Sequence, residues 1–165
     1  MACGKTTLAR ALARSLGREF IDLDLYIEQR FHARISEIFA TRGEEEFRRM
    51  EAAMLREAGA MLNVVVACGG GTPCFHDNAA WMLENGSVVF LDTTEECIVR
   101  RLAINRSRRP LMADKSEEEL REAVARGLSA RRPFYEQCHI RYPGDRLENR
   151  AQIAETVAAL TPLLP

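Results

Sequence analysis

The residues nearest the start of the chain form a candidate phosphate-binding site. Gly4, Lys5 and Thr6 are followed at once by leucines and alanines whose spacing predicts a helix over 8–16. Glycine lets backbone N–H groups close on phosphate oxygens, and a helix N-terminus adds partial positive charge. Lys5 would reach the β- and γ-phosphates of a nucleotide, and the Thr6 hydroxyl would bind Mg²⁺. The predicted nucleotide contacts here are Cys3, Gly4, Lys5, Thr6 and Thr7.

These residues match only the second half of a P-loop. The full pattern is G-x-x-x-x-G-K-[ST] after a strand, and its first glycine would lie two residues before Met1. That strand normally lies at the sheet centre, where each ladder hydrogen bond contributes about 1 kcal/mol. We therefore expect either further residues upstream of Met1 in the working protein or a damaged chain. A chain starting at Met1 should bind ATP poorly and melt well below one extended by a strand.

Two carboxylates follow a short strand predicted over 19–23. Alternation along a strand would place Asp22 and Asp24 on the same side. One could hold Mg²⁺ through water, and the other could accept a proton from a substrate hydroxyl. An aspartate just before residues 25–28 is equally a good helix N-cap, so the residues alone leave both interpretations open.

Short apolar strands alternate with helices along the chain. Strands are predicted over 19–23, 63–67, 87–91 and 138–142, and helices over 8–16, 35–40, 44–62, 77–84, 94–104, 116–132 and 149–160. This alternation is typical of parallel β-α-β units and predicts one three-layer α/β domain over 1–165. Ligands in such domains bind beyond the carboxyl ends of the strands, where the aspartates and a triple glycine at 69–71 lie.

The composition excludes several classes of protein. The chain has 165 residues, of which 47% are hydrophobic and 28% charged, which is typical of a single globular domain. A net charge of −1 argues against general nucleic-acid binding, and no apolar run is long enough to span a membrane. Five cysteines without an export signal favour a reducing cytoplasm. We expect a cytoplasmic monomer that binds a small-molecule substrate.

Several short motifs, in order, resemble those of shikimate kinase from Cys3 to about Tyr135. They lie at residues 20–28, 35–39, 43–51, 69–71, 109–111 and 131–135. The resemblance implies a P-loop kinase fold, with ATP and Mg²⁺ as cofactors. It also implies transfer of the γ-phosphoryl group of MgATP to the 3-hydroxyl of shikimate, on the route to chorismate and aromatic amino acids.

The resemblance implies roles for individual residues on the acceptor side. Asp22 matches an aspartate linked to Mg²⁺, and Asp24 matches the proposed base, which also contacts the substrate hydroxyls. Arg48 and Arg131 match the residues that bind the shikimate carboxylate, which a guanidinium can grip with two parallel hydrogen bonds. The backbone amides of Gly69, Gly70 and Gly71 would face the substrate.

The resemblance also implies roles on the nucleotide side. Arg109 would lie on a mobile lid at about 105–117 that closes over ATP and substrate, although a solvated basic loop is the alternative. Arg101 is expected near adenine, and residues 144–149 resemble the loop that closes over it. The predicted catalytic residues are Lys5, Asp24 and Arg109, and the predicted metal ligands are Thr6 and Asp22.

Two other functions stay open at this point. A gluconate-type kinase would share the P-loop, but the D-x-D, F-R-R-x-E and triple-glycine motifs disfavour it. The incomplete P-loop favours a non-catalytic binding protein that resembles shikimate kinase. Cys68, Cys74 and His76 could suggest a metal site, but Cys68 ends a buried strand, which favours a structural thiol.

Overall fold

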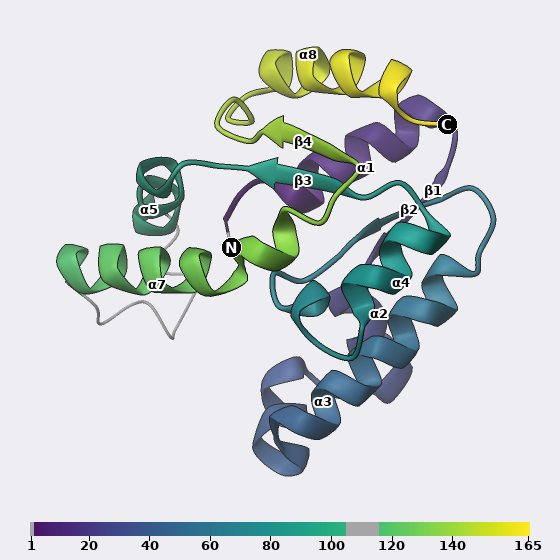
Figure 1. The fold of residues 1–165 in the computed structure, drawn as a ribbon, viewed down its shortest axis with the longest axis vertical. Coiled ribbons are helices and arrows are strands. Elements are labelled where there is room, and N and C mark those ends of the chain that lie inside the picture. Colours follow the sequence, from purple (N-terminus) through teal and green to yellow (C-terminus); the bar gives the residue numbers. More distant parts are fainter. Residues whose placement is uncertain (1, 105–115) are drawn as a thin grey trace.

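Strands and helices alternate along the chain, as the apolar pattern predicts. The computed structural model describes residues 2–104 and 116–165 (Figure 1). The first half contains α1 (Lys5–Leu16), β1 (Glu19–Asp22), α2 (Leu23–Phe31), α3 (Ile35–Gly59), β2 (Val64–Ala67) and a 3₁₀ turn (Thr72–Cys74). The second half contains α4 (Asn78–Asn85), β3 (Val89–Asp92), α5 (Glu95–Ile104), α7 (Glu117–Tyr135), β4 (Ile140–Pro143), α8 (Arg150–Leu160) and a 3₁₀ turn (Thr161–Leu163).

The strands form two parallel pairs. β1 pairs with β2, with Asp22 opposite Ala67, and β3 pairs with β4, with Asp92 opposite Pro143. Figure 1 shows the β3–β4 pair beside α8 and the β1–β2 pair closer to α2 and α3. Among the described residues no strand hydrogen-bonds one pair to the other. The predicted parallel sheet is therefore present as two halves.

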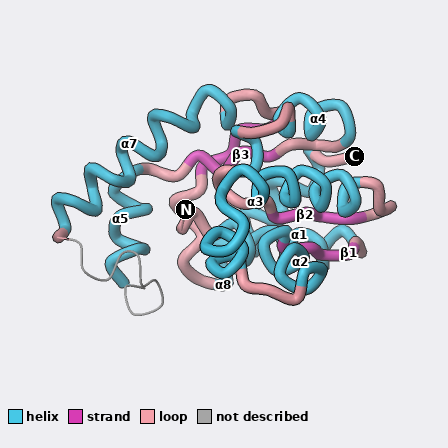
Figure 2. Tube along the Cα trace, turned by 90° about the horizontal axis from the view of Figure 1, so that it is seen from below, coloured by secondary structure: helices cyan, strands magenta, loops and turns pink. Residues whose placement is uncertain are grey.

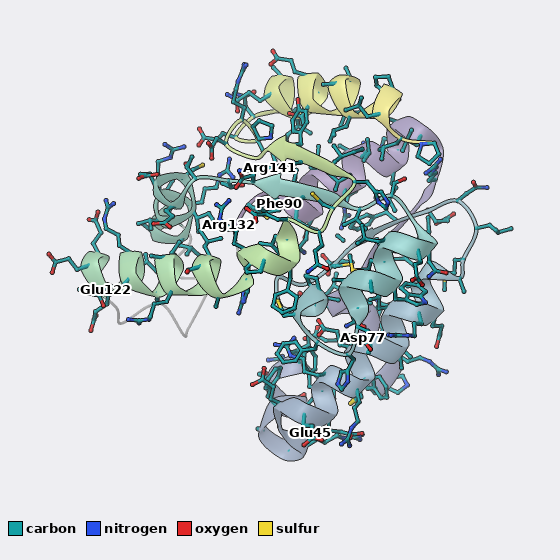
Figure 3. All side chains as sticks on the ribbon, viewed as in Figure 1. Glu45, Asp77, Phe90, Glu122, Arg132 and Arg141 are labelled. Atoms are coloured by element: carbon teal, nitrogen blue, oxygen red, sulfur yellow. The ribbon has the colours of Figure 1, made fainter. Side chains whose placement is uncertain are left out.

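Helices cover both faces of these strands, which gives the three predicted layers. On one face α1 and α8 pack together, and Val89 and Leu91 of β3 lie against their leucines. Phe90 points to the opposite face, where its ring centroid lies 5.2 Å from that of Tyr135 on α7. Arg132 of α7 and Arg141 of β4 both pair with Asp92 at the end of β3 (Figure 3). α7 is thereby tied to the carboxyl end of the β3–β4 pair.

A second core lies under the β1–β2 pair. Leu23 and Ile27 of α2 are fully buried against Ile38 and Leu55 of α3, and Val66 of β2 packs on the same cluster. The predicted helices 35–40 and 44–62 follow one another within α3. They are separated at Gly43, whose φ of 79° breaks the helical path. The predicted break is thus confirmed.

The end of β1 differs from the prediction. The strand stops at Asp22, whose Oδ1 accepts a hydrogen bond from the Leu25 N–H at 3.5 Å as the N-cap of α2. Asp24 therefore lies in the first turn of a helix, and the argument from strand alternation is wrong. The capping interpretation is correct for Asp22, because its side chain satisfies a free N–H of the first turn.

The α5–α7 pair forms a separate cluster at one end of the molecule. Ile98, Leu102, Leu120 and Val124 are buried between the two helices, which lie side by side in Figure 2. The predicted lid at 105–117 lies outside the described residues except for its last two positions, Ser116 and Glu117, at the start of α7. None of the described helices combines the length and the apolarity that crossing a membrane would require.

Candidate active site

The phosphate-binding residues lie at the N-terminus of α1. Gly4 is the N-cap, with a φ of 84°, and a Cβ at this position would lie 3.1 Å from the Leu147 side chain. Both the left-handed backbone and the close approach therefore require glycine. Lys5 begins the helix, and its Nζ lies 3.4 Å from Thr6 Oγ1. Cys3 and Thr7 flank these residues, and Thr7 is exposed.

Thr6 and Asp22 come together across the gap between α1 and β1. The Thr6 hydroxyl donates to Asp22 Oδ2 at 2.9 Å. A hydroxyl and one carboxylate are hard oxygen donors, which fit Mg²⁺ when phosphates and water complete its coordination. The described residues contain no group of three or more His, Cys, Asp or Glu side chains suited to a metal ion. Such a group is unnecessary for a magnesium ion carried in with a nucleotide.

Asp24 lies between the phosphate-binding residues and the triple glycine. Burial raises the pKa of its carboxyl above the ordinary 3.8, while Lys5 lowers it in part and Asp22 and Glu51 raise it further. A carboxylate with a raised pKa is a stronger base than one in water. The position of Asp24 therefore suits it to accept a proton.

Each glycine of the triple lies beside a different side chain, and two of these, Asp24 and Arg48, belong to the predicted site. A Cβ at Gly69 would lie 3.1 Å from Asp24 Oδ1, and one at Gly71 would lie 2.8 Å from both terminal nitrogens of Arg48. The Gly70 carbonyl accepts a hydrogen bond of 2.6 Å from the Tyr135 hydroxyl. The loop after β2 thus joins α2, α3 and α7 at one place.

Arg48 is held on three sides. Its Nη1 donates to Glu51 Oε2 at 2.8 Å and its Nη2 to Glu44 Oε1 at 3.0 Å. The Phe75 ring centroid lies 4.2 Å from the guanidinium carbon, within the range of a cation–π contact. The neighbouring Arg49 instead pairs with Glu45 and Glu46 and is mostly exposed. The structure therefore distinguishes Arg48 from Arg49 by burial.

Arg131 and Arg48 lie near the same thiol. Burial raises the pKa of Cys74, and the positive charges of Arg131 and Arg48 lower it in part. Arg131 lies one turn before Tyr135 on α7. The Tyr135 hydroxyl bonds to Gly70, so the helix that carries Arg131 contacts the glycine loop. Guanidinium groups from α3 and α7 thus both act on the charge of Cys74, and the role of Arg131 at the carboxylate stays a prediction.

A buried polar network supports this side of the site. Glu51 is 1% exposed, and its Oε1 accepts a hydrogen bond of 2.6 Å from the Thr72 hydroxyl. Asn78, also buried, donates to the Thr72 carbonyl and accepts from Arg56, with both bonds between 2.8 and 2.9 Å. None of these residues belongs to the predicted site. The one signal in the sequence is the spacing of Glu51, which lies three residues after Arg48 on a helix and can therefore pair with it.

Arg101 lies against the loop that follows β4. Its two terminal nitrogens donate to the carbonyls of Gly144 and Asp145, at 3.0 and 2.8 Å. Leu147 of the same loop lies on Gly4. The predicted neighbour of adenine therefore holds a loop that contacts the P-loop. Arg109, the predicted lid residue, lies outside the described residues.

Cys68 is a buried thiol at the end of β2. Burial raises the pKa of Cys68 to about 12, so this thiol stays protonated at neutral pH. All five cysteines are free. This agrees with the interpretation of Cys68 as a structural thiol.

Comparison with known proteins gives one consistent family. The shikimate kinase family model matches residues 1–161. A shikimate kinase of Bacteroides fragilis is 45% identical over 164 residues, covering 99% of this chain and 92% of the relative. The crystal structure of shikimate kinase from Bacteroides thetaiotaomicron superposes with a TM-score of 0.95 at 44% identity, covering 99% of this chain and 93% of that one.

A second solved structure adds a ligand to the comparison. Shikimate kinase from Acinetobacter baumannii, in complex with shikimate, is 33% identical, with a TM-score of 0.81. The match covers 99% of this chain and 87% of that one. The family model spans nearly all of the chain and the relatives agree with it over the same length. This chain belongs to the shikimate kinase family.

Proposed function

We propose that this protein transfers the γ-phosphoryl group of MgATP to the 3-hydroxyl of shikimate, on the route to chorismate. One observation carries the proposal: the glycine loop brings a base candidate, a buried guanidinium and an α7 tyrosine to one place. In the reaction the hydroxyl oxygen bonds to the γ-phosphorus and the bond to the β-phosphate oxygen breaks. The products are shikimate 3-phosphate and ADP.

The acceptor would be recognised through its opposite ends. Shikimate is an anion with three hydroxyl groups on a small ring. Arg48 and Arg131 would bind the carboxylate, each with two parallel hydrogen bonds. The Gly69–Gly71 loop has no side chains to keep the ring away from its backbone, and Asp24 lies beside it to accept from the hydroxyls. This arrangement would orient one hydroxyl toward the phosphate side.

The donor would be bound by the residues around α1. The backbone N–H groups at Gly4 and Lys5 would bind phosphate oxygens, with Lys5 adding charge at the β- and γ-phosphates. Thr6 and Asp22 would hold Mg²⁺, which neutralises phosphate charge when bound. Arg101 would lie near adenine beside the 144–149 loop, and Arg109 would come from the lid.

Asp24 would take the proton that the attacking hydroxyl loses. Burial raises its pKa, which favours acceptance of a proton, and Lys5 offsets part of that rise. Phosphoryl transfer depends mainly on positioning and on charge neutralisation. The acceptor side would position the substrate hydroxyl, and Lys5 on the phosphate side would neutralise charge on the transferred phosphoryl group.

ADP release from MgATP, followed in a coupled assay, tests this proposal. We expect release that depends on shikimate and saturates with it, and no response to gluconate at the same concentration. Titration calorimetry with shikimate and Arg48→Ala provides an independent readout, because the variant should lose binding. Release that responds to gluconate instead would overturn the substrate assignment. Shikimate binding without ADP release from any acceptor would favour a binding protein.

We also propose that the protein acts as a monomer, since every residue assigned a role comes from the same chain. Sedimentation velocity at assay concentrations should give the mass of one chain, 18.6 kDa. A stable dimer would contradict this part of the proposal.

A further inference from the structure

The ring of Phe75 covers the guanidinium group of Arg48. Its centroid lies 4.2 Å from the guanidinium carbon, closer than the ring of Phe47 at 5.1 Å. The Arg48 side chain is 13% exposed, whereas Phe75 is 36% exposed and belongs to none of the hydrophobic clusters that the described residues form. Phe75 therefore contributes little to the core, and its ring lies at the surface over a cation.

The other contacts of Arg48 turn one edge of its guanidinium toward the glycine loop. Nε and Nη2 both donate to Glu44 Oε1, at 3.3 and 3.0 Å, and Nη1 donates to Glu51 Oε2 at 2.8 Å. The edge formed by Nη1 and Nη2 lies beside Gly71, where a Cβ would be 2.8 Å from both nitrogens. Because glycine has no Cβ, this edge keeps room for a carboxylate, which a guanidinium binds with two parallel hydrogen bonds.

Hydrogen bonds at the edges and a ring on the face constrain a guanidinium in different directions. The bonds to Glu44 and Glu51 lie along its N–H groups and limit rotation within its plane. An aromatic ring over the face attracts the cation and limits tilting of the plane. The ring also keeps water from that face, which strengthens the attraction to a bound anion. Phe75 thus supplies a constraint that the two carboxylates do not.

The backbone after Phe75 follows a strained path. His76 and Asp77 both have left-handed conformations, with φ of 48° and 55°. Neither residue is glycine, so each conformation costs energy and persists only where neighbouring contacts hold it. Arg56 of α3 provides one such contact, because its Nη2 donates to the His76 carbonyl at 3.1 Å. The strained segment is therefore held by α3 at Arg56 and covers the same helix at Arg48, about two turns earlier.

We propose that Phe75 is a positioning residue of the acceptor site. Its ring fixes the plane of the Arg48 guanidinium, so that Nη1 and Nη2 face the carboxylate of the acceptor. The strained turn at His76 and Asp77 holds the ring in that place. This inference deepens the proposed function and rests on it only for the identity of the carboxylate.

Substitutions at Phe75 separate the aromatic face from apolar bulk. Phe75→Leu keeps an apolar side chain and removes the ring, so the KM for shikimate should rise about fivefold, with a smaller change in kcat. Phe75→Tyr keeps the ring and should restore the parent KM. Phe20→Leu is the matched control, because Phe20 covers Arg10 at 4.9 Å, outside the acceptor site, and its KM should equal that of the parent.

A double-mutant cycle tests whether Phe75 acts through Arg48. An ammonium has no plane to fix, so in the Arg48→Lys background Phe75→Leu should change the KM less than about twofold. Equal changes in the two backgrounds would overturn the proposal, since Phe75 would then act independently of the guanidinium. An unchanged KM in Phe75→Leu, or an equal rise in Phe75→Leu and Phe75→Tyr, would overturn it as well.

The NMR signal of the Arg48 Nε–H group gives a readout that does not need the reaction. This signal, identified by its loss in Arg48→Lys, should move in Phe75→Leu through the lost ring current and stay in place in Phe20→Leu. An unchanged signal in Phe75→Leu would overturn the proposal. The signal also follows binding of cyclohex-1-ene-1-carboxylate, a probe with the ring and carboxylate of shikimate and no hydroxyl groups.

The probe distinguishes failure of this inference from failure of the proposed function. We expect about fivefold weaker probe binding in Phe75→Leu than in the parent chain. That result without any phosphorylation of shikimate would support the positioning role and refute the proposed function. Equal probe binding in the two chains would overturn the positioning role, whether or not shikimate is phosphorylated.

Discussion

The acceptor side and the phosphate side of the site are held in different ways. On the acceptor side, hydrogen bonds with little exposure hold the side chains: Arg48 to Glu51 at 2.8 Å, Thr72 to Glu51 at 2.6 Å and Tyr135 to the Gly70 carbonyl at 2.6 Å. On the phosphate side Lys5 reaches Thr6 at 3.4 Å, and Thr6 reaches Asp22. The geometry of Gly4–Thr7 therefore depends mainly on the backbone path into α1.

The residues assigned to shikimate binding and those assigned to phosphoryl transfer are thus held by different contacts. The residues assigned to the shikimate carboxylate keep their positions through contacts among α3, α7 and the glycine loop. The residues assigned to ATP depend on the backbone at the start of α1, where Gly4 is the N-cap. Substitutions on the two sides should therefore affect different kinetic constants.

The largest effect is expected on the phosphate side, from Lys5→Met. Removing one preorganised charge at the transferring group should lower kcat by about 10³-fold. The affinity for shikimate, measured by calorimetry without nucleotide, should stay within a factor of two of the parent chain. An equal loss of shikimate affinity would show that the two sides are not separable.

Asp24→Asn should lower kcat by about 10²–10³-fold, because the amide cannot accept the proton. The same variant should be more stable than the parent at neutral and alkaline pH. Burial raises the pKa of Asp24 above 3.8, so the folded chain binds this proton more tightly than the unfolded chain. As the pH rises from the pKa of this carboxyl in the unfolded chain to its higher pKa in the folded chain, ionisation of Asp24 increasingly opposes folding.

Urea unfolding at pH 3 and pH 8 checks this second expectation. The stability difference between Asp24→Asn and the parent should be small at pH 3, where the carboxyl is protonated in both states. It should favour the variant at pH 8. A variant less stable than the parent at pH 8 would show that the attraction to Lys5 outweighs burial.

Arg48→Lys should raise the KM for shikimate by about 10- to 100-fold with a smaller change in kcat, because an ammonium cannot form two parallel hydrogen bonds to a carboxylate. Its charge still faces Glu51, so the chain should stay folded. Arg49→Lys is the matched control, since Arg49 pairs only with exposed Glu45 and Glu46 among the described residues. Similar KM changes in the two variants would remove Arg48 from the site.

The smallest effect is expected from Tyr135→Phe, which removes one hydrogen bond to the Gly70 carbonyl and keeps the ring on Phe90. A single neutral bond is worth about 1 kcal/mol, so kcat/KM should fall about fivefold. Tyr142→Phe, on β4, should leave kcat/KM unchanged. Equal effects of the two substitutions would mean that Tyr135 does not position the loop.

Local patterns in the sequence predicted much of the fold and the ends of its elements. Gly17 ends α1 in the left-handed conformation, and Gly43 separates two helical segments, because both effects arise from backbone freedom at one residue. The position of Asp24 was wrong because capping by Asp22 starts α2 earlier than strand alternation suggests. The strand pattern would extend β1 to residue 23, but the cap formed by Asp22 starts α2 at Leu23.

The hydrogen bonds of the buried network could not be predicted from the sequence, for a different reason. Thr72 and Asn78 join Glu51 and Arg56 across 21 and 22 residues of sequence, through a loop without periodicity. No spacing rule links such positions, whereas Arg48 and Glu51 share a helix. The acceptor side is thus predictable where a motif covers it, and its support appears only in three dimensions.

The buried pair of Arg48 and Glu51 also limits how this protein can evolve. Losing Arg48 alone leaves the carboxylate of Glu51, which is 1% exposed, without its cation. Breaking such a pair costs about 3–5 kcal/mol out of a typical total stability of about 5–15 kcal/mol. A mutational route to an uncharged acceptor at this position therefore passes through a chain that is less stable than the present one. If Arg48 binds the acceptor carboxylate as proposed, new acceptor specificities should arise first around Asp24 or residues 69–71, and the requirement for a carboxylate should persist.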